Sequence, residues 1–406
     1  MRTSIFKCEA VTPMLSRSMN KKKENSWKFE LRPQSVKGVM RFWFRALVPC
    51  VIDPDWYEGE HKKFEGLHRL ESMIFGSQGE KSPFSLSVTY DDSDEPVDNL
   101  TKDQTLRNSL FGTFQMGKGD TSPSFSFLKP GSTFTIKITY SKKVPEVQKD
   151  LTDSLISFIS NYGGFGAKAR DGYGSFRIVA GRGFEKKDFL NQPSRSKELL
   201  SLYIKELSKD LVPSKEIIDL TPYDFPTLAI SREKVAFVNS DDWRIIIREL
   251  TGRRTKDGEP ISRYSELKLN ELRKYNEADD NLNPLRKAFF EHMAPSKEFV
   301  LRTSIMGLPI IYQNVGQRPN TTGKAIITVS NSDDGTGRKA SPLFISIHKA
   351  VNNSYFARIL LMASKISPER DSRDRPVIYA KVGSKSYPIL GNENFEELWN
   401  LIEGVI

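Results

Sequence analysis

The stretch GGFGAKARDGYGS, Gly163–Ser175, carries five glycines in thirteen residues and stands where a helical pattern gives way to a strand pattern. Read literally, Gly164–Ala169 satisfies the dinucleotide-binding spacing G-x-G-x-x-G/A. That motif binds a pyrophosphate when its glycines follow a strand and open a helix. Here the order is reversed, because the helical stretch VPEVQKDLTDSLISFISNY precedes the glycines and SFRIVA follows them. We therefore exclude the nucleotide interpretation, and the sequence contains no P-loop G-x-x-x-x-G-K-[ST].

The apolar pattern around this stretch predicts the fold of the first half. Alternation of apolar and polar residues indicates a strand, and an apolar period of 3.6 residues indicates a helix. Strands are expected at Thr3–Thr12, Trp27–Leu31, Phe84–Tyr90, Ser124–Leu128, Ser132–Tyr140 and Ser175–Ala180. Helices are expected at Ser35–Val48, His61–Gly76 and Val144–Tyr162. With its decorations set aside, this order of strand, helix, strand, strand, helix, strand is the ferredoxin-like, split βαβ pattern.

The second half is predicted to follow a linker at Gly181–Lys197. Helices are expected at Lys197–Leu211, Asp241–Thr251, Glu266–Tyr275 and Leu282–Met293. The later stretches GLPIIY, KAIITVS, SPLFISI and SYFARILLMA are strand-like, and NFEELWNLIEGV forms a short amphipathic helix. We therefore expect an α+β fold with an N-terminal domain over residues 1–190 and a C-terminal domain over residues 191–406.

Composition places the chain in the ordinary globular class. It has 406 residues, of which 38% are hydrophobic and 28% charged. No apolar run approaches the roughly 18–20 residues that span a bilayer, and the N-terminus lacks the order of a signal peptide. We expect a cytoplasmic protein with no membrane partner. Cys8 and Cys50 are interpreted as buried thiols, and the four histidines lack zinc-site spacing, so we expect neither a metal nor a cofactor.

The net charge of +10 favours nucleic acid weakly, and the position of the charge matters more. In the glycine-rich stretch, Gly164 and Gly166 would let a phosphate backbone approach main-chain amides, and Lys168 and Arg170 supply charge. Phe165 and Tyr173 could stack on bases. The alternative is a glycine-rich connection that solves a tight geometry. The stretch alone does not decide between these interpretations.

A second basic feature lies on the helix predicted at Ser35–Val48. Lys37, Arg41 and Arg45 are spaced by four and form one cationic stripe, with Arg32 just before the helix. A solvated helix face is the usual explanation for three charges, but no acid on this helix offsets them. Arg338 and Lys339, in DDGTGRKASPLFISI, form a third basic stretch at the mouth of a strand.

Catalytic motifs are scarce. The sequence contains no G-x-S-x-G, no H-E-x-x-H and no spaced carboxylate set for metal ions. His292 and His68 each lie near charged residues, and a lone histidine is more often structural.

Taken together, LRPQSVKGVMRFWFRAL, ESMIFGS and GGFGAKARDGYGSF resemble the RAMP superfamily of CRISPR-associated proteins, and GLPI and GRKASPLFISI strengthen the match. The resemblance covers both halves and points to the Cmr module, the type III-B effector complex. It implies two ferredoxin-like, RRM-related domains packed together, with helical insertions in the second.

The resemblance also implies a function. It implies a non-catalytic RNA-binding subunit in antiviral defence, lying near the 3′ end of the guide RNA beside the other Cmr RAMP subunits. Guide RNA and target RNA would be its partners, and target cleavage would belong to another subunit. The residues expected to contact RNA are Arg32, Lys37, Arg41, Arg45, Gly164, Gly166, Lys168, Arg170, Arg338 and Lys339. Asp171 departs from the uniformly basic loop that the family leads us to expect.

Two alternatives remain open at this point. The first is a metal-independent CRISPR RNA-processing endoribonuclease of the same superfamily, with His292 or His68 as general acid or base. The second is a protein-interaction scaffold whose basic residues only improve assembly.

Overall fold

The computed structural model forms two compact units, each built from several segments of the chain. The first unit is 1–221, 227–253 and 344–360, and the second is 222–226, 254–343 and 361–406. The structure describes residues 2–21, 27–53, 64–91, 94–96, 98–103, 106, 109–110, 126–182, 193–209, 222–251, 262–267, 283–291, 293–308, 310–313, 324–330, 339–382 and 384–405. Among these residues no helix is long and apolar enough to cross a membrane.

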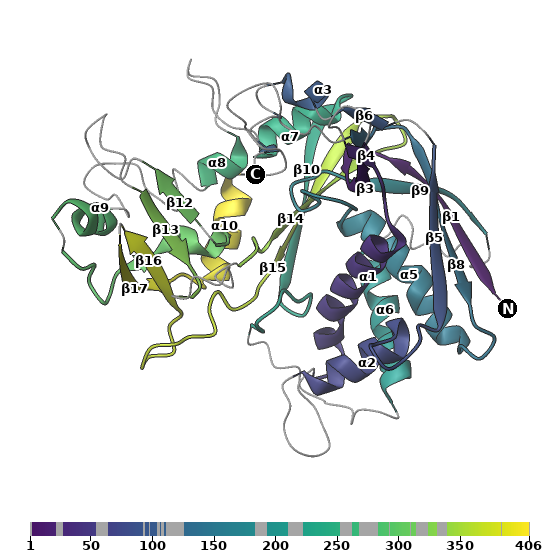
Figure 1. The fold of residues 1–406 in the computed structure, drawn as a ribbon, viewed down its shortest axis with the longest axis horizontal. Helices are drawn as coiled ribbons and strands as arrows, with labels where there is room; N and C mark the ends of the chain where they lie inside the picture. Colours follow the sequence, from purple (N-terminus) through teal and green to yellow (C-terminus); the bar gives the residue numbers. More distant parts are fainter. Residues whose placement is uncertain are drawn as a thin grey trace. The chain divides into compact units, whose positions relative to one another are not determined.

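A four-stranded sheet organises the first unit, with the strand order β5-β8-β1-β9 and antiparallel pairing between neighbours (Figure 1). Its strands are β1 (Thr3–Ala10), β5 (Phe84–Tyr90), β8 (Thr133–Tyr140) and β9 (Phe176–Arg182). Helix α1 (Pro33–Leu47) connects β1 to β5, and α5 (Glu146–Tyr162) connects β8 to β9. This is the element order predicted from the sequence. The last of these strands in the chain, β9, pairs with the first, β1.

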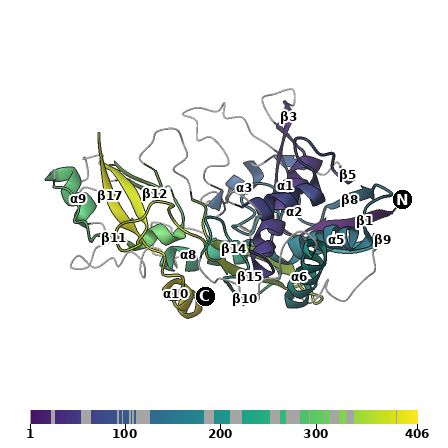
Figure 2. The ribbon, with the colours of Figure 1, turned by 90° about the horizontal axis from the view of Figure 1, so that it is seen from below.

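Burial along the strands shows which face of the sheet carries the core. In β1 the buried residues alternate, and in β8 Phe134, Ile136, Ile138 and Tyr140 are buried while the residues between them are more exposed. Alternation of this kind indicates an antiparallel sheet with one covered face. Helices α1 and α5 cover that face in both views (Figures 1 and 2).

Helix α1 has the apolar period that predicts it from the sequence, but its start differs from the predicted one at Ser35. Val36, Met40, Trp43, Phe44 and Leu47 are buried, as a helical period requires. The helix begins at Pro33, with Arg32 in the cap position and no side-chain cap. Proline suits this position because the first helical N–H has no partner within the helix. The helix therefore begins two residues before Ser35, where the sequence predicts its start.

Further helices and small sheets complete the first unit. Helices α2 (Glu65–Phe75) and α6 (Pro193–Ser208) pack against α1, and α6 also packs along α5. Short strands form two further sheets: β2 (Met14–Leu15), β7 (Ser126–Leu128) and β6 (Asp94–Pro96) in one, and β3 (Arg17–Lys21) and β4 (Trp27–Phe29) in the other. Helix α3 (Asp98–Thr101) follows β6.

The first unit also contains most of a three-stranded sheet with the order β10-β15-β14. Its elements are β10 (Ser231–Ser240), α7 (Trp243–Thr251), β14 (Leu343–Lys349) and β15 (Tyr355–Met362). Their chain order is strand, helix, strand, strand, with the second unit's residues 254–343 inserted after the helix.

The second unit has a five-stranded sheet of order β11-β17-β16-β13-β12, in which only the pair β11–β17 is parallel among the pairs described. The strands are β11 (Val300–Leu301), β12 (Ile310–Gln313), β13 (Lys324–Thr328), β16 (Val377–Val382) and β17 (Lys385–Gly391). Its helices are α8 (Arg263–Glu266), α9 (Asn283–Phe290) and α10 (Phe395–Val405), with a 3-10 segment at Arg302–Met306. Apolar residues such as Ile327, Ile378 and Ile389 form its core.

A buried carboxylate fastens β1 and β8 to helix α5. Asp153 accepts hydrogen bonds from the Tyr140 hydroxyl at 2.5 Å and the Ser4 hydroxyl at 2.7 Å. Arg2 donates to Asp153 at 2.6 Å and to Asp150 at 2.8 Å. Burial raises the pKa of Asp153 to about 6, because desolvation outweighs the hydrogen bonds and the charge of Arg2.

This shift predicts a pH dependence of stability. A folded-state pKa above the unfolded value means that the folded chain holds the proton more tightly, so stability is lost as pH rises from about 4 to about 6. Relative to Asp153→Asn, which cannot ionise, the unmodified chain should lose roughly 2–3 kcal/mol across that window. Urea unfolding of both proteins between pH 4 and pH 7 measures the difference. A constant difference across the window would contradict the prediction.

Candidate nucleic-acid interface

The glycine-rich loop Gly163–Ser175 is closed by a hydrogen bond between its two ends and is bonded to the segment Pro13–Leu15. The Phe165 N–H donates to the Gly174 carbonyl at 3.0 Å, which brings the two ends of the loop together. The Ala167 N–H donates to Leu15 at 2.7 Å, and the Gly174 N–H donates to Pro13 at 2.9 Å. The backbone φ of Gly174 is +69°, where glycine is favoured. Most of the glycines therefore solve a tight geometry, as the structural interpretation of this stretch predicts.

The two aromatic residues of the loop do not serve as stacking platforms. Phe165 is fully buried and its ring stacks on Phe176 with centroids 4.8 Å apart. Tyr173 is also fully buried, and its hydroxyl lies 2.6 Å from that of Ser109. The expectation that these rings stack on bases is wrong, because both rings are part of the core of the first unit.

What the loop exposes is its tip, from Gly166 to Ala169. Gly166 and Ala167 are exposed, while Lys168 is half-buried with a φ of +61°. Within the described part of the chain, the N–H groups of Gly166, Lys168 and Ala169 have no hydrogen-bond partner. Free N–H groups beside a cation make a surface suited to an anionic oxygen. Asp171 is accounted for as well, because its carboxylate lies 3.4 Å from the Lys168 ammonium.

Arg170 points its guanidinium at rings of the first unit. Its Cζ lies 4.4 Å from the ring centroid of Phe344 and 5.4 Å from that of Phe42. Burial lowers the pKa of Arg170, with the charge of Asp171 acting against that shift. The Arg170 carbonyl accepts the Ile345 N–H at 2.8 Å, so this residue joins the loop to β14. Its predicted RNA contact stays a prediction.

The cationic stripe of α1 faces a buried carboxylate that comes from α2. Arg41 donates to Glu71 at 2.7 Å and to the Gly76 carbonyl at 2.6 Å. Arg45 donates to both oxygens of Glu71. The Glu71 side chain is 5% exposed, whereas those of Arg41 and Arg45 are 30% and 45% exposed. The stripe is therefore neutralised in part, although no acid lies on its own helix.

The electrostatics of this cluster follow from its burial. Desolvation disfavours ionisation of Glu71, but hydrogen bonds and charge from Arg45 and Arg41 outweigh it and lower the pKa of Glu71. Lys37, one turn earlier on α1, donates to the Ser82 hydroxyl at 2.8 Å, and its pKa is lowered by burial and by Arg41. Sequence reasoning missed Glu71, although ESMIFGS places this acid in a predicted helix.

The remaining predicted RNA contacts, Arg32, Arg338 and Lys339, lie in different surroundings. Arg32 is exposed, and its side chain has no partner among the residues that the structure describes. Lys339, in the second unit, donates to the Asp224 carbonyl at 2.8 Å. Arg338 lies outside the described residues. Among the predicted RNA contacts that the structure describes in the first unit, Arg32 and the loop tip are thus the ones that combine exposure with donors that have no partner.

Of the two catalytic candidates, the structure describes only His68, which has no partner among the described residues. His68 is exposed on α2, and His292 lies outside the described residues. His348 is bonded to the Ser346 hydroxyl at 2.8 Å, and burial lowers its pKa to about 3. Among the described residues, no group of three or more His, Cys, Asp or Glu side chains could hold a metal ion.

Comparison with known proteins places this geometry in a family context. Residues 7–177 match the family model of the RAMP superfamily, a range that contains α1, the loop and Glu71. The chain therefore resembles RAMP superfamily proteins, as its motifs predict.

Two curated relatives narrow the resemblance to CRISPR system Cmr subunits of Pyrococcus furiosus. Cmr1-1 is 33% identical over 152 residues, which are 37% of this chain and 41% of that protein. Cmr1-2 is 27% identical over 197 residues, which are 44% of this chain and 96% of that protein. The match thus spans about two fifths of Cmr1-1. The chain is thus similar to the RAMP superfamily over residues 7–177 and to CRISPR-associated proteins of the Cmr1 type, the first-numbered RAMP subunit of the Cmr module.

Solved structures share the fold. The apo crystal structure of Pyrococcus furiosus Cmr1 aligns with a TM-score of 0.53 at 16% identity, covering all of this chain and 97% of that one. A chain of the type III-B Cmr-beta complex bound to cognate target RNA and AMPPnP aligns with a TM-score of 0.52 at 14% identity, covering 100% and 98%. At these identities the likeness concerns the fold.

Proposed function

We propose that this protein is a non-catalytic RNA-binding subunit of a type III-B Cmr effector complex, which acts with guide RNA, target RNA and other Cmr subunits in the cytoplasm. The observation that carries the proposal is the exposed loop tip Gly166–Ala169, with its free N–H groups and Lys168. The similarity to Cmr1-1 and Cmr1-2 supports the complex, and the solved Cmr-beta complex contains target RNA.

We also infer that the second predicted domain, over 191–406, contains a ferredoxin-like sheet packed with the first domain. In the four-stranded sheet, β8 lies between β1 and β5, so the third of these strands in the chain pairs with both the first and the second. The three-stranded sheet has the same arrangement, because β15 lies between β10 and β14. Helix α7 also follows β10, as α1 follows β1. This repetition supports two related domains, with helices α8 and α9 in the insertion.

The hydrogen bonds and buried rings that anchor the loop influence how it would bind RNA. Because its ends are bonded to each other and its rings lie in the core, the tip needs little ordering when a phosphate binds. Backbone N–H groups and lysine recognise phosphate without reading the base, so we expect contact along an RNA backbone with little sequence preference. The burial of Phe165 and Tyr173 supports the same expectation.

We expect Arg32→Gln combined with Lys168→Gln to weaken single-stranded RNA binding roughly tenfold near 0.1 M salt. Loss of two phosphate contacts should also flatten the dependence of log affinity on log salt by about 1.4. Fluorescence anisotropy across a salt series measures both effects. Lys209→Gln serves as the control, because Lys209 is exposed on the first unit and pairs with Glu206. An unchanged slope in the double variant would remove the loop tip and Arg32 from the RNA surface.

The same purified protein tests the ribonuclease alternative. The proposal predicts that repeat-containing RNA stays intact when incubated with the protein in chelator. Site-specific cleavage that is abolished by His292→Ala or by His68→Ala would favour the enzyme instead.

A further inference from the structure

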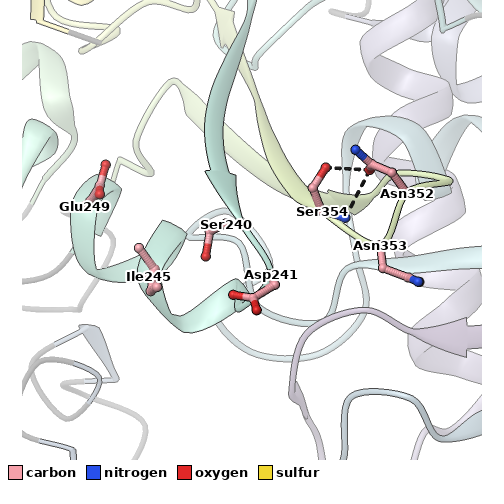
Figure 3. Close-up of a pocket in the computed structure, with 7 residues that line it drawn as sticks. All are labelled: Ser240, Asp241, Ile245, Glu249, Asn352, Asn353 and Ser354. Carbon is pink, nitrogen blue, oxygen red and sulfur yellow. Dashed lines mark hydrogen bonds between the residues drawn. The ribbon is translucent and has the colours of Figure 1, made fainter.

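A pocket of about 480 Å³ opens in the first unit, on residues that the RNA proposal does not use. It is lined by Ser240, Asp241, Ile245, Glu249, Asn352, Asn353 and Ser354. Figure 3 shows the turn with Asn352–Ser354 on one side and Ile245 and Glu249 of α7 on the other, with Asp241 between them. The pocket is thus formed by the end of β10, by α7 and by the turn that joins β14 to β15.

The pocket contains two carboxylates whose charge nothing in the described chain offsets. Neither Asp241 nor Glu249 has a hydrogen-bond or ion-pair partner among the described residues. Helix capping does not account for Asp241, because the neighbouring Asp242 accepts the Arg244 N–H at 2.9 Å. The pocket is thus acidic, although the net charge of the chain is +10.

The basic side chains of α7 are bonded to other acids. Arg244 lies 3.6 Å from the Asp242 carboxylate and over the Trp243 ring at 5.4 Å. Arg248, next to Glu249 in sequence, bonds instead to Asp103. The negative charge of the pocket is therefore open to a cation from outside the chain.

Two apolar side chains are exposed here, one in the lining of the pocket and one next to a lining residue in the sequence. Ile245, one helical turn before Glu249, has 37% of its surface exposed. Val351, adjacent to Asn352 in the turn, is fully exposed. Arginine and lysine pack their aliphatic stems on apolar surface while the charged head meets a polar group, so an exposed aliphatic side chain beside carboxylates suits such a residue. The donor group of the Asn352 amide is also available, because its oxygen alone is used, by Ser354 at 2.7 Å and 3.1 Å.

We propose that this pocket binds an arginine or lysine side chain of a protein partner, with an apolar residue of the same partner segment packing on Ile245 and Val351. The carboxylates match a cationic side chain and would repel the phosphates of RNA. The proposal assigns this face to protein contact and leaves RNA to the loop tip. It does not depend on the RNA proposal.

The test is site-specific photo-crosslinking of the full chain in its own cells. A benzophenone amino acid is placed at Val351, and at Leu202 as the control, since Leu202 is 61% exposed on α6. We expect a protein adduct at Val351 well above the Leu202 level, with a crosslinked peptide that carries arginine or lysine. Asp241→Asn with Glu249→Gln should reduce the adduct at least tenfold, whereas Glu198→Gln with Glu206→Gln, an equal charge change on exposed residues of α6, should not.

A reciprocal charge exchange completes the test. Asp241→Lys with Glu249→Lys should restore the adduct when the partner's basic residue is changed to glutamate. Melting temperatures of the variants confirm that the chain is folded, and their RNA affinity should be unchanged. An adduct no stronger than at Leu202, an adduct to RNA, a partner peptide without a basic residue, or insensitivity to the neutralising pair would each overturn the proposal.

Discussion

Gly174→Ala is expected to destabilise the first unit by at least about 4 kcal/mol. A Cβ atom at this position would overlap the Phe165 carbonyl oxygen, which belongs to the backbone and cannot rotate away. The φ of +69° adds the cost of a left-handed conformation, roughly 1–2 kcal/mol for a residue with a Cβ. Loss of the Phe165–Gly174 hydrogen bond would open the loop and release Phe165 and Tyr173 from the core.

The control for this variant is another glycine in the same unit. Gly38 lies within α1, and a Cβ there would meet nothing within 4 Å. Gly38→Ala should therefore raise stability by up to about 1 kcal/mol through helix propensity. Urea unfolding followed by circular dichroism measures both variants. Equal behaviour of Gly174→Ala and the unmodified chain would show that the loop geometry does not require glycine.

The predicted parts of the fold are those with a local cause. The order β1, α1, β5, β8, α5, β9 could be read from apolar periods that lie within single stretches of the chain. The wrong order of helix and strand was likewise enough to reject the dinucleotide motif. By contrast, each compact unit consists of segments that are distant in sequence. A single boundary near residue 190 divides the chain into two continuous parts, so it does not correspond to these units. That predicted boundary stays a prediction.

The candidate site shows the same limit at the level of side chains. The sequence places Phe165 and Tyr173 beside basic residues, but their orientation is decided by Phe176 and by Ser109, the latter 64 residues away. It also shows no acid on α1, although Glu71 reaches Arg41 from a separate helix 30 residues later. Partner identity across such separations depends on tertiary packing, which no local pattern encodes.

Glu71→Gln is expected to destabilise the first unit by about 3 kcal/mol, because it leaves two guanidinium groups without their buried counter-charge. The lowered pKa of Glu71 gives this contribution a pH dependence with a definite sign. It is present above the ordinary carboxyl pKa and is lost as pH falls through the lower folded-state value. Glu65→Gln, the same change in the first turn of α2, should cost less than about 1 kcal/mol.

RNA affinity should move in the opposite direction to stability in Glu71→Gln. Freed from the carboxylate, Arg41 and Arg45 give α1 a more positive surface, so binding should tighten and its salt dependence should steepen. Removing the arginines themselves lowers both stability and affinity, and therefore cannot separate a structural role from RNA contact. Urea unfolding and anisotropy on one preparation of Glu71→Gln separate the two. Unchanged affinity in a folded variant would mean that Arg41 and Arg45 serve the α1–α2 packing alone, and that RNA contact rests on Arg32 and the loop tip.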